Sequence, residues 1–313
     1  MLDRITNSMK VNRTLQYLSN NMNSIQKTQE QISSGKMIRV ASDDPIGAIQ
    51  SMTINNSLKK VAQYGKNIDN GISFLEHTSS VLTQIEDILM EIKTIAENGA
   101  SDVTTSAERS AFAFQVDQML QELIQAANSK YEGKFIFGGT ETLSGTAVNS
   151  APFNIRMSGS SIAGVIQNPK GISGEIKRLV NDGKYVTINI AGDAVFQPNG
   201  EGGEDDIFQT IIKLRENLLA NDGNEIQKRI RELDNEFDLL VGQNTLAGSK
   251  VVRMQLISDQ LEDLKVIHKE HLSNIEDTDV AEAIMRLQIQ EVTLQATLNA
   301  SSRILQKSLL DYI

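Results

Sequence analysis

The two ends of this chain carry apolar residues at a spacing of three and four, and a glycine-rich segment lies between them. This spacing puts the apolar side chains on one narrow stripe of a helix, which is typical of helices that pack along one another. The N-terminal stripe contains Val11, Leu15, Leu18, Met22, Ile25 and Ile32. The C-terminal stripe contains Val280, Ile284, Leu287, Leu294, Leu298 and Leu305. We therefore predict a seam for helix packing at each end of the chain.

Polar residues interrupt both stripes, at Gln29 in the first and at Glu291 and Ser301 in the second. Taken alone, an apolar stripe is more often part of an intramolecular core than of a contact between subunits. The stripes by themselves therefore leave both interpretations open.

Composition narrows the class of protein. Aromatic residues make up 4% of the 313 residues and tryptophan is absent, which favours helical bundles over a compact enzyme with a thick core. The net charge of −10 argues against nucleic-acid binding, because phosphate groups need a cationic surface. The absence of cysteine excludes disulfides, thiolate nucleophiles and cysteine-ligated metals. We see neither a run of about 18 apolar residues for membrane insertion nor the apolar run of a signal peptide.

Residues that typically begin or end helices define the bounds of the first helices. We expect a helix from about residue 6 to 34 that ends at Gly35, because glycine accepts the left-handed conformation that closes a helix. Residues 36–44 form a connector. Asp44 followed by Pro45 is a strong start signal for the next helix, which should run to about 98–99 with Ile68, Ile72, Leu75, Leu82, Ile85, Leu89 and Ile92 in its seam. A further helix at about 106–129 should bury Phe112, Val116, Met119, Leu120, Leu123 and Ile124.

The middle of the chain changes to short β-rich runs between glycines. These runs are FIFG, FNIRM, SIAGVIQ and YVTINI, within residues 135–203. After Asp206 the helical pattern resumes. A nearly continuous heptad repeat then contains Ile226, Ile230, Leu233, Phe237, Leu240, Ala247, Val251, Met254 and Leu261. Asp279, with Glu282 three residues later, predicts the start of the final helix.

These observations predict a mainly α fold with an inserted β domain. We expect the N- and C-terminal arms to form a long antiparallel helical rod or coiled-coil bundle. The predicted parts are terminal helices at 1–44 and 275–313, a helical rod at 45–137 and 205–274, and a variable outer β domain at 138–204. Charge supports the pairing of the arms, since residues 1–42 have four more basic than acidic side chains and residues 275–313 have three more acidic than basic. Exposed ion pairs are worth only roughly 0–1 kcal/mol, so charge would orient the arms more than stabilise them.

Candidate chemical groups are few. His268, Glu270 and His271 lie close in sequence, but such a pair on a charged helix face is better explained by solvation than by metal binding. Paired carboxylates at Asp43 and Asp44 are better explained by helix capping than by acid–base catalysis. The acidic residues Glu201, Glu204, Asp205 and Asp206 could gather a cation, but a polar turn leading into a helix N-terminus explains them better. The glycines of GKFIFGGTETLSG lack phosphate-loop spacing. We therefore predict no catalytic, cofactor or metal site.

Two segments resemble a known family. ISSGKMIRVASDDPIGA at 32–48 resembles the N-terminal signature of bacterial flagellins and hook-associated proteins, in which a Ser-Ser-Gly turn precedes Asp-Asp and the next helix. SNIEDTDVAEAIMRLQIQEVTLQATLNASSRILQKSLLDYI at 273–313 resembles their C-terminal signature. The ending SLLDYI and the run GKFIFGGTET at 133–142 are similar to members that join the hook to the filament. Residues 145–204 match nothing in the family, as expected of a variable outer domain.

This resemblance implies a non-enzymatic structural role without a cofactor. The chain would form rings of its own copies at the hook–filament junction, between another hook-associated protein on the hook side and flagellin on the filament side. The family leaves the cell through the flagellum's own type III export channel, so an extracellular location without a cleaved leader is expected. An export chaperone is a further candidate partner. The alternatives are a short flagellin that forms the filament itself and, from another class, an intracellular helical scaffold protein.

Overall fold

The computed structural model describes residues 7–142, 151–159, 161–168, 172–203 and 205–310. Contacts divide the chain into two compact units. We call residues 1–60 with 263–313 the terminal unit and residues 61–262 the rod unit. Two long helices, α2 (Pro45–Ala100) and α6 (Gly223–Glu276), contribute to both units. The described part of the chain is mainly helical with short β hairpins in the middle, as the sequence predicts.

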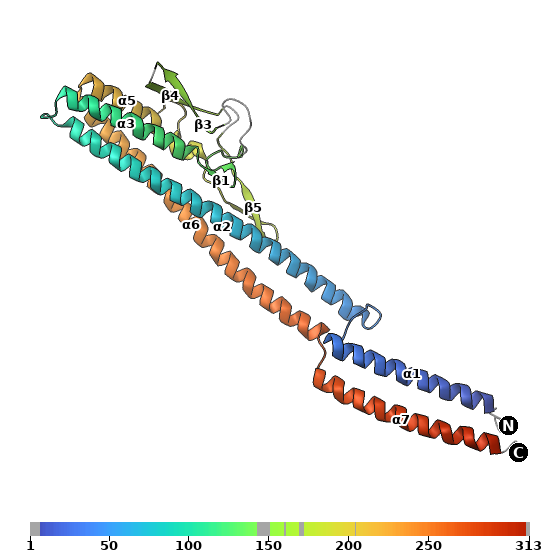
Figure 1. The fold of residues 1–313 in the computed structure, drawn as a ribbon. Coiled ribbons are helices and arrows are strands. Elements are labelled where there is room, and N and C mark those ends of the chain that lie inside the picture. The colour runs from blue at the N-terminus through green and yellow to red at the C-terminus, as the bar shows by residue number, and fades with distance from the viewer. Residues whose placement is uncertain (1–6, 143–150, 160, 169–171, 204, 311–313) are drawn as a thin grey trace. The chain divides into compact units, whose positions relative to one another are not determined.

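The terminal unit is built on a pair of helices, α1 (Asn7–Ser34) and α7 (Val280–Leu310). They lie side by side and run antiparallel, with the two chain ends at the same end of the pair (Figure 1). A bridge between Lys36 and Asp277 fixes the other end. The predicted pairing of the two arms is confirmed.

The predicted boundaries of the first helices are confirmed for the described residues. Gly35, with φ of +68°, closes α1 in the left-handed region. α2 begins at Pro45, and the Oδ1 atom of Asp44 accepts the N–H of Ile46 at 3.0 Å. That bond satisfies one of the free N–H groups of the first turn. The two residues are thus a cap and a first helical position.

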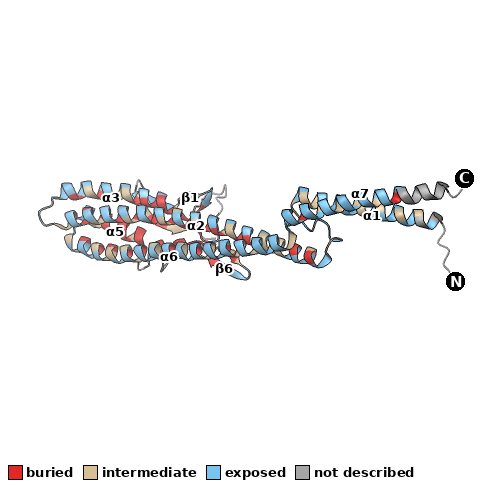
Figure 2. Ribbon diagram, turned by 90° about the horizontal axis from the view of Figure 1, so that it is seen from below, coloured by how far each residue is buried: buried red, intermediate tan, exposed pale blue. Residues whose placement is uncertain are grey.

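Helices of the rod unit bury the predicted seams. In α2 every residue of the predicted seam is buried except Ile72, which is half-buried. In α3 (Ser106–Ala127) Phe112 and Met119 are half-buried and the other predicted residues are buried. The heptad of α6 has no exposed member. Polar contacts align α2 with α6: Ser79 donates to Asn244 at 2.6 Å, and Lys93 pairs with Asp234 at 2.5 Å. Figure 2 shows the buried residues on the facing sides of these helices.

The helical segment after Asp206 is not continuous, and the heptad repeat that begins at Ile226 does not predict the break. α5 (Ile207–Ala220) ends at Asn221, whose φ of +59° lies in the left-handed region, and α6 begins at Gly223. Asn-Asp-Gly is a strong turn sequence because each residue tolerates conformations that end a helix. α5 packs against α3 and against strand β4 (Ser161–Gln167).

The β segments form three separate two-stranded antiparallel sheets within the described residues. β1 (Lys130–Tyr131) pairs with β2 (Lys134–Phe135), β3 (Phe153–Ser158) with β4, and β5 (Lys177–Asn181) with β6 (Lys184–Thr187). The runs FNIRM and SIAGVIQ are strands as predicted, whereas FIFG and YVTINI are strands only at their first residues. β5 was not predicted, because KRLVN has little β-branched or aromatic content.

Strands β3 and β4 and the rod helices share one hydrophobic core. A short helix, α4 (Gly192–Phe196), contributes the fully buried Phe196. Its ring lies 4.9 to 5.5 Å from the rings of Phe137, Phe153 and Phe208. The division that assigns residues 138–204 to a separate outer domain stays a prediction. Within the described ranges, no helix has the length and apolar content needed to cross a membrane.

One buried carboxyl group makes the free energy of unfolding depend on pH. Glu236 of α6 is 1% exposed, its Oε1 accepts the Thr210 hydroxyl at 2.6 Å, and its Oε2 contacts no donor. Burial, opposed by the Thr210 hydrogen bond and aided by the nearby charges of Asp206 and Glu232, raises the pKa of Glu236 from 4.5 to about 8. The folded chain therefore keeps this proton at pH values where the unfolded chain has lost it, so the free energy of unfolding falls as pH rises from 4.5 to 8.

Glu236→Gln removes that proton equilibrium. We expect the variant to match the wild type near pH 4.5 and to become more stable as pH rises, by on the order of 3 kcal/mol near pH 7. Thermal melts of both chains at several pH values measure this gap. A gap that stays constant between pH 5 and pH 8 would contradict a proton held on Glu236.

A second prediction concerns the start of α7. The Oδ1 atom of Asp279 accepts the N–H groups of Ala281 and Glu282 at 2.9 and 3.2 Å. Asp279→Ala should cost about 1 kcal/mol of local helix stability and speed exchange of these two amide hydrogens roughly fivefold. Asp279→Ser is the matched control, because serine also caps. Unchanged exchange in the alanine variant would show that the cap is not needed.

Candidate functional site

The acidic groups weighed as chemical sites have structural roles. Asp206 is the N-cap of α5, and its carboxylate accepts N–H groups of Gln209 and Gly202 and the Gln197 amide. Glu201 pairs with Arg156 at 3.3 Å. Glu204 lies outside the described residues. In the part of the chain that the structure describes, no group of three or more histidine and acidic side chains is placed to hold a metal ion.

The contact between α1 and α7 uses part of each predicted stripe and adds polar and small residues that the stripes did not include. Apart from Glu30 and Gln31, which contact the connector, the half-buried or buried residues described in α1 are Val11, Thr14, Leu18, Asn21, Ile25, Thr28 and Ile32. Those of α7 are Ala283, Leu287, Gln290, Leu294, Thr297 and Ser301. These residues repeat at three and four, the a and d positions of a heptad. Except for Ser301, the a positions are apolar, and they alternate with polar or small side chains at d.

Polar groups weaken this contact. The Asn21 amide donates to the Thr297 hydroxyl across the pair at 3.3 Å, and the hydroxyls of Thr28 and Ser301 donate to carbonyl groups of their own helices. Each polar d position replaces apolar surface that a coiled coil would otherwise bury. The pair of helices therefore has a specific register but a thin apolar contact.

The remaining residues of the predicted stripes are exposed. Leu15 and Met22 of α1 are 58% and 60% exposed, and Ile284 and Leu298 of α7 are 43% and 45% exposed. These residues flank the contact at the heptad position after d. Leu294 and Leu298, four apart, therefore differ, since the first faces α1 and the second faces solvent. The side chain of Leu305 lies outside the described residues.

Two further apolar rows were missed in the sequence. Met285, Ile289 and Val292 lie on the face of α7 opposite α1 and are all more than half exposed. Ile46, Ile49 and Met52 form a similar row on the first turns of α2. The signal was present, since both rows follow helical spacing. Together with the exposed stripe residues described above, these residues form three exposed apolar rows in the described part of the terminal unit. We call them the flanking row (Leu15, Met22, Ile284 and Leu298), the α7 outer row (Met285, Ile289 and Val292) and the α2 row (Ile46, Ile49 and Met52).

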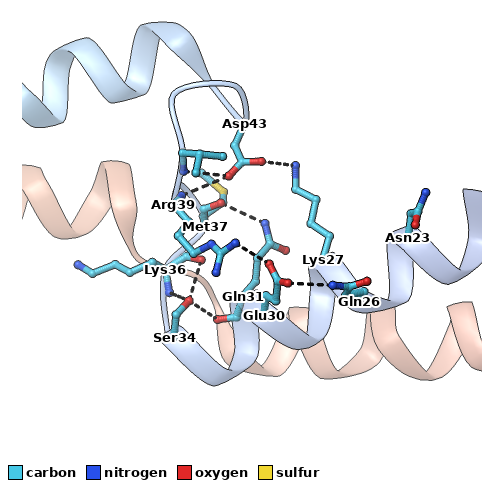
Figure 3. Close-up of a pocket in the computed structure, with 11 residues that line it drawn as sticks. Asn23, Gln26, Lys27, Glu30, Gln31, Ser34, Lys36, Met37, Arg39 and Asp43 are labelled. Atoms are coloured by element: carbon cyan, nitrogen blue, oxygen red, sulfur yellow. Dashed lines mark hydrogen bonds and ion pairs between the residues drawn. The ribbon is translucent and has the colours of Figure 1, made fainter.

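The connector at residues 36–44 folds back on the end of α1, around a polar hollow of about 240 Å³ (Figure 3). Lys27 pairs with Asp43 at 2.8 Å, and Arg39 pairs with Glu30 at 3.1 Å. The Gln31 amide donates to the carbonyl of Met37 at 3.1 Å. Asp43 also accepts the N–H groups of two connector residues, and together with Lys27 these bonds lower the pKa of its carboxyl. The signature residues thus hold the turn between α1 and α2.

The same connector joins the end of α6 to the start of α7. Lys36 pairs with Asp277 at 2.6 Å and with Glu276 at 3.2 Å, and these carboxylates raise the pKa of its ammonium group. The N–H of Thr278 donates to the Gly35 carbonyl at 3.0 Å. Among the described residues, the ion pairs between the two arms all involve Lys36. In the described residues, the predicted opposite charge of the arms is therefore used at the connector end of the pair.

Comparisons with known proteins identify the family. The model of the bacterial flagellin N-terminal helical region matches residues 5–142, and that of the C-terminal helical region matches residues 230–313. These matches contain α1, α7, the connector and the α2 row.

Individual relatives agree with the family models. Flagellar hook-associated protein 3 of Salmonella typhimurium is 22% identical, with 94% of each chain covered. The flagellar filament 30.7 kDa core protein of Treponema maltophilum is 31% identical over 46% of this chain and 48% of its own. A solved putative flagellar hook-associated protein from Vibrio parahaemolyticus has the same fold, with a TM-score of 0.65, 19% identity, and coverage of 75% of this chain and all of that one. The chain therefore belongs to the flagellin family, as a structural component of the bacterial flagellum and not an enzyme.

Proposed function

We propose that this chain forms the extracellular junction between hook and filament by packing the exposed rows of its terminal unit against neighbouring subunits. The observation that carries the proposal is the exposed apolar surface of the terminal unit: in the described residues the α1–α7 pair buries one thin face and leaves two apolar rows uncovered, and α2 carries a third. Burial of apolar surface is the main favourable term in protein association. Contiguous apolar rows exposed on three helices are typical of surfaces that assembly covers.

The neighbours in this proposal are of three kinds. Copies of this chain complete a ring, another hook-associated protein lies on the hook side, and flagellin lies on the filament side. All would present terminal helices of the same family, so one type of contact serves each neighbour.

The filament subunit is the second candidate. It is favoured by the match to filament core proteins, but these matches cover less than half of the chain. Hook-associated protein 3, by contrast, aligns along 94% of both chains. The full-length similarity supports the junction. Membership of the flagellin family argues against an intracellular scaffold.

Paired charge substitutions test the proposal. Ile284→Glu with Leu298→Glu places two charges on the flanking row, where water solvates them in the free chain but an apolar neighbour would not. We expect α1 and α7 to keep the wild-type amide exchange while cells that export the variant lose their filaments and release flagellin. Leu287→Glu with Leu294→Glu should instead disrupt the α1–α7 contact in the free chain and raise its exchange.

Two further results complete this test. Glu291→Gln, on the same helix, is the control and should leave filaments intact. Melting of the rod unit should be unchanged in all three variants, because none of the residues belongs to its core. Normal filaments with the Ile284→Glu and Leu298→Glu variant would remove the flanking row from the mechanism, and filaments made of this chain itself would support the filament subunit.

A further inference from the structure

The sulfur atoms of this chain are unusually placed. The chain has ten methionines and no cysteine, so all its sulfur is in thioethers. Met254 is fully buried, and its methyl group packs over Gly71 of α2. Seven others are between 44% and 68% exposed: Met9, Met22, Met37, Met52, Met90, Met157 and Met285. A side chain that normally fills cores is therefore mostly on the surface here.

Each exposed apolar row of the terminal unit contains one of these methionines. Met22 is in the flanking row, Met52 in the α2 row and Met285 in the α7 outer row, and they are 60%, 68% and 58% exposed. The neighbouring members of the rows are leucine, isoleucine and valine, which peroxides do not attack. Each row thus has one oxidisable position that is open to solvent before assembly.

The chemistry at these positions is a two-electron oxygen transfer. The lone pair of the thioether sulfur attacks one oxygen of a peroxide, an S–O bond forms as the O–O bond breaks, and the other oxygen takes up the proton and leaves as water or an alcohol. The sulfur is oxidised to a sulfoxide, which is polar and a strong hydrogen-bond acceptor. Burying it against an apolar neighbour without a donor is unfavourable.

We propose that Met22, Met52 and Met285 are peroxide-sensitive modification sites at which sulfoxide formation blocks incorporation of the free subunit. The inference rests on the proposed function, since the rows must be buried on assembly for the sulfoxide to matter. Met254, the fully buried methionine of the rod unit, is shielded from solvent, and Met119 of the same unit is half-buried against its core. A subunit oxidised before it reaches the junction stays folded and fails to bind.

The test uses purified full-length chain and hooks isolated from cells that lack it. Hydrogen peroxide is added to the free chain until peptide mass spectrometry shows oxygen addition at the three row methionines and none at Met254. We expect an unchanged melting temperature and co-sedimentation with hooks reduced roughly tenfold or more. A variant with Met22→Leu, Met52→Leu and Met285→Leu keeps the apolar rows and should bind equally before and after peroxide.

A matched control separates these sites from the other exposed methionines. A variant with Met90→Leu and Met157→Leu, both in the rod unit, should lose binding on oxidation as the wild type does. Loss of binding by the oxidised row variant, or its failure to bind before treatment, would overturn the inference alone. Untreated wild-type chain that does not sediment with hooks would overturn the proposed function and the inference with it.

Discussion

A pair of helices has one shared face, and this constraint governs the terminal unit. Whatever apolar residues lie elsewhere on α1 and α7 stay in contact with water until another chain arrives. Here the shared face is thin as well, because Thr14, Asn21 and Thr28 occupy one of the two rows that a coiled coil would fill with apolar side chains. Polar contacts and the ion pairs of Lys36 therefore hold the two helices in one register, and much of the apolar surface of the pair stays exposed.

The rod unit solves the same problem internally. Its helices are covered by one another and by the β hairpins, so that rings from β3, α4 and α5 meet in one core. The seam of α6 is buried or half-buried up to Leu261. Off the seam, α6 has exposed apolar residues in both units: Val252 and Leu256 are 56% and 58% exposed in the rod unit, and Val266 and Ile267 are 57% and 49% exposed in the terminal unit.

Local signals in the sequence were sufficient for most of the fold. Gly35 and the Asp44–Pro45 pair define helix ends through backbone chemistry that needs no tertiary context, and the seams of α2 and α6 follow from periodicity. The α5–α6 break was missed because the heptad was read from Ile226 onward, although Asn221 to Gly223 carries a turn signal. β5 could not be predicted, because its residues have weak β propensity and pair only through the hairpin with β6.

The candidate site was harder to predict, and the reason is geometric. Leu18 and Met22 are four apart on a helix, and a spacing of four and three fits two neighbouring rows equally well. Which of the two rows faces α7 depends on how α7 packs against α1. Because the d residues of the contact are polar or small, apolar spacing alone does not identify that row. The contact of Lys36 with Asp277 joins residues 241 positions apart, which no local pattern reveals. The resemblance of residues 32–48 to the family signature marked the connector, but its bonds to α1 and α7 came from the structure.

The central claim is that the flanking row is open in the free chain and covered in the assembled one, while the row beside it is covered in both. Because the chain has no cysteine, a single introduced thiol reports on one position. Maleimide labelling of Leu298→Cys and Leu294→Cys variants, free and assembled on hooks, measures this directly. We predict fast labelling at position 298 only in the free chain and slow labelling at position 294 in both states. Equally fast labelling at position 298 after assembly would contradict the account.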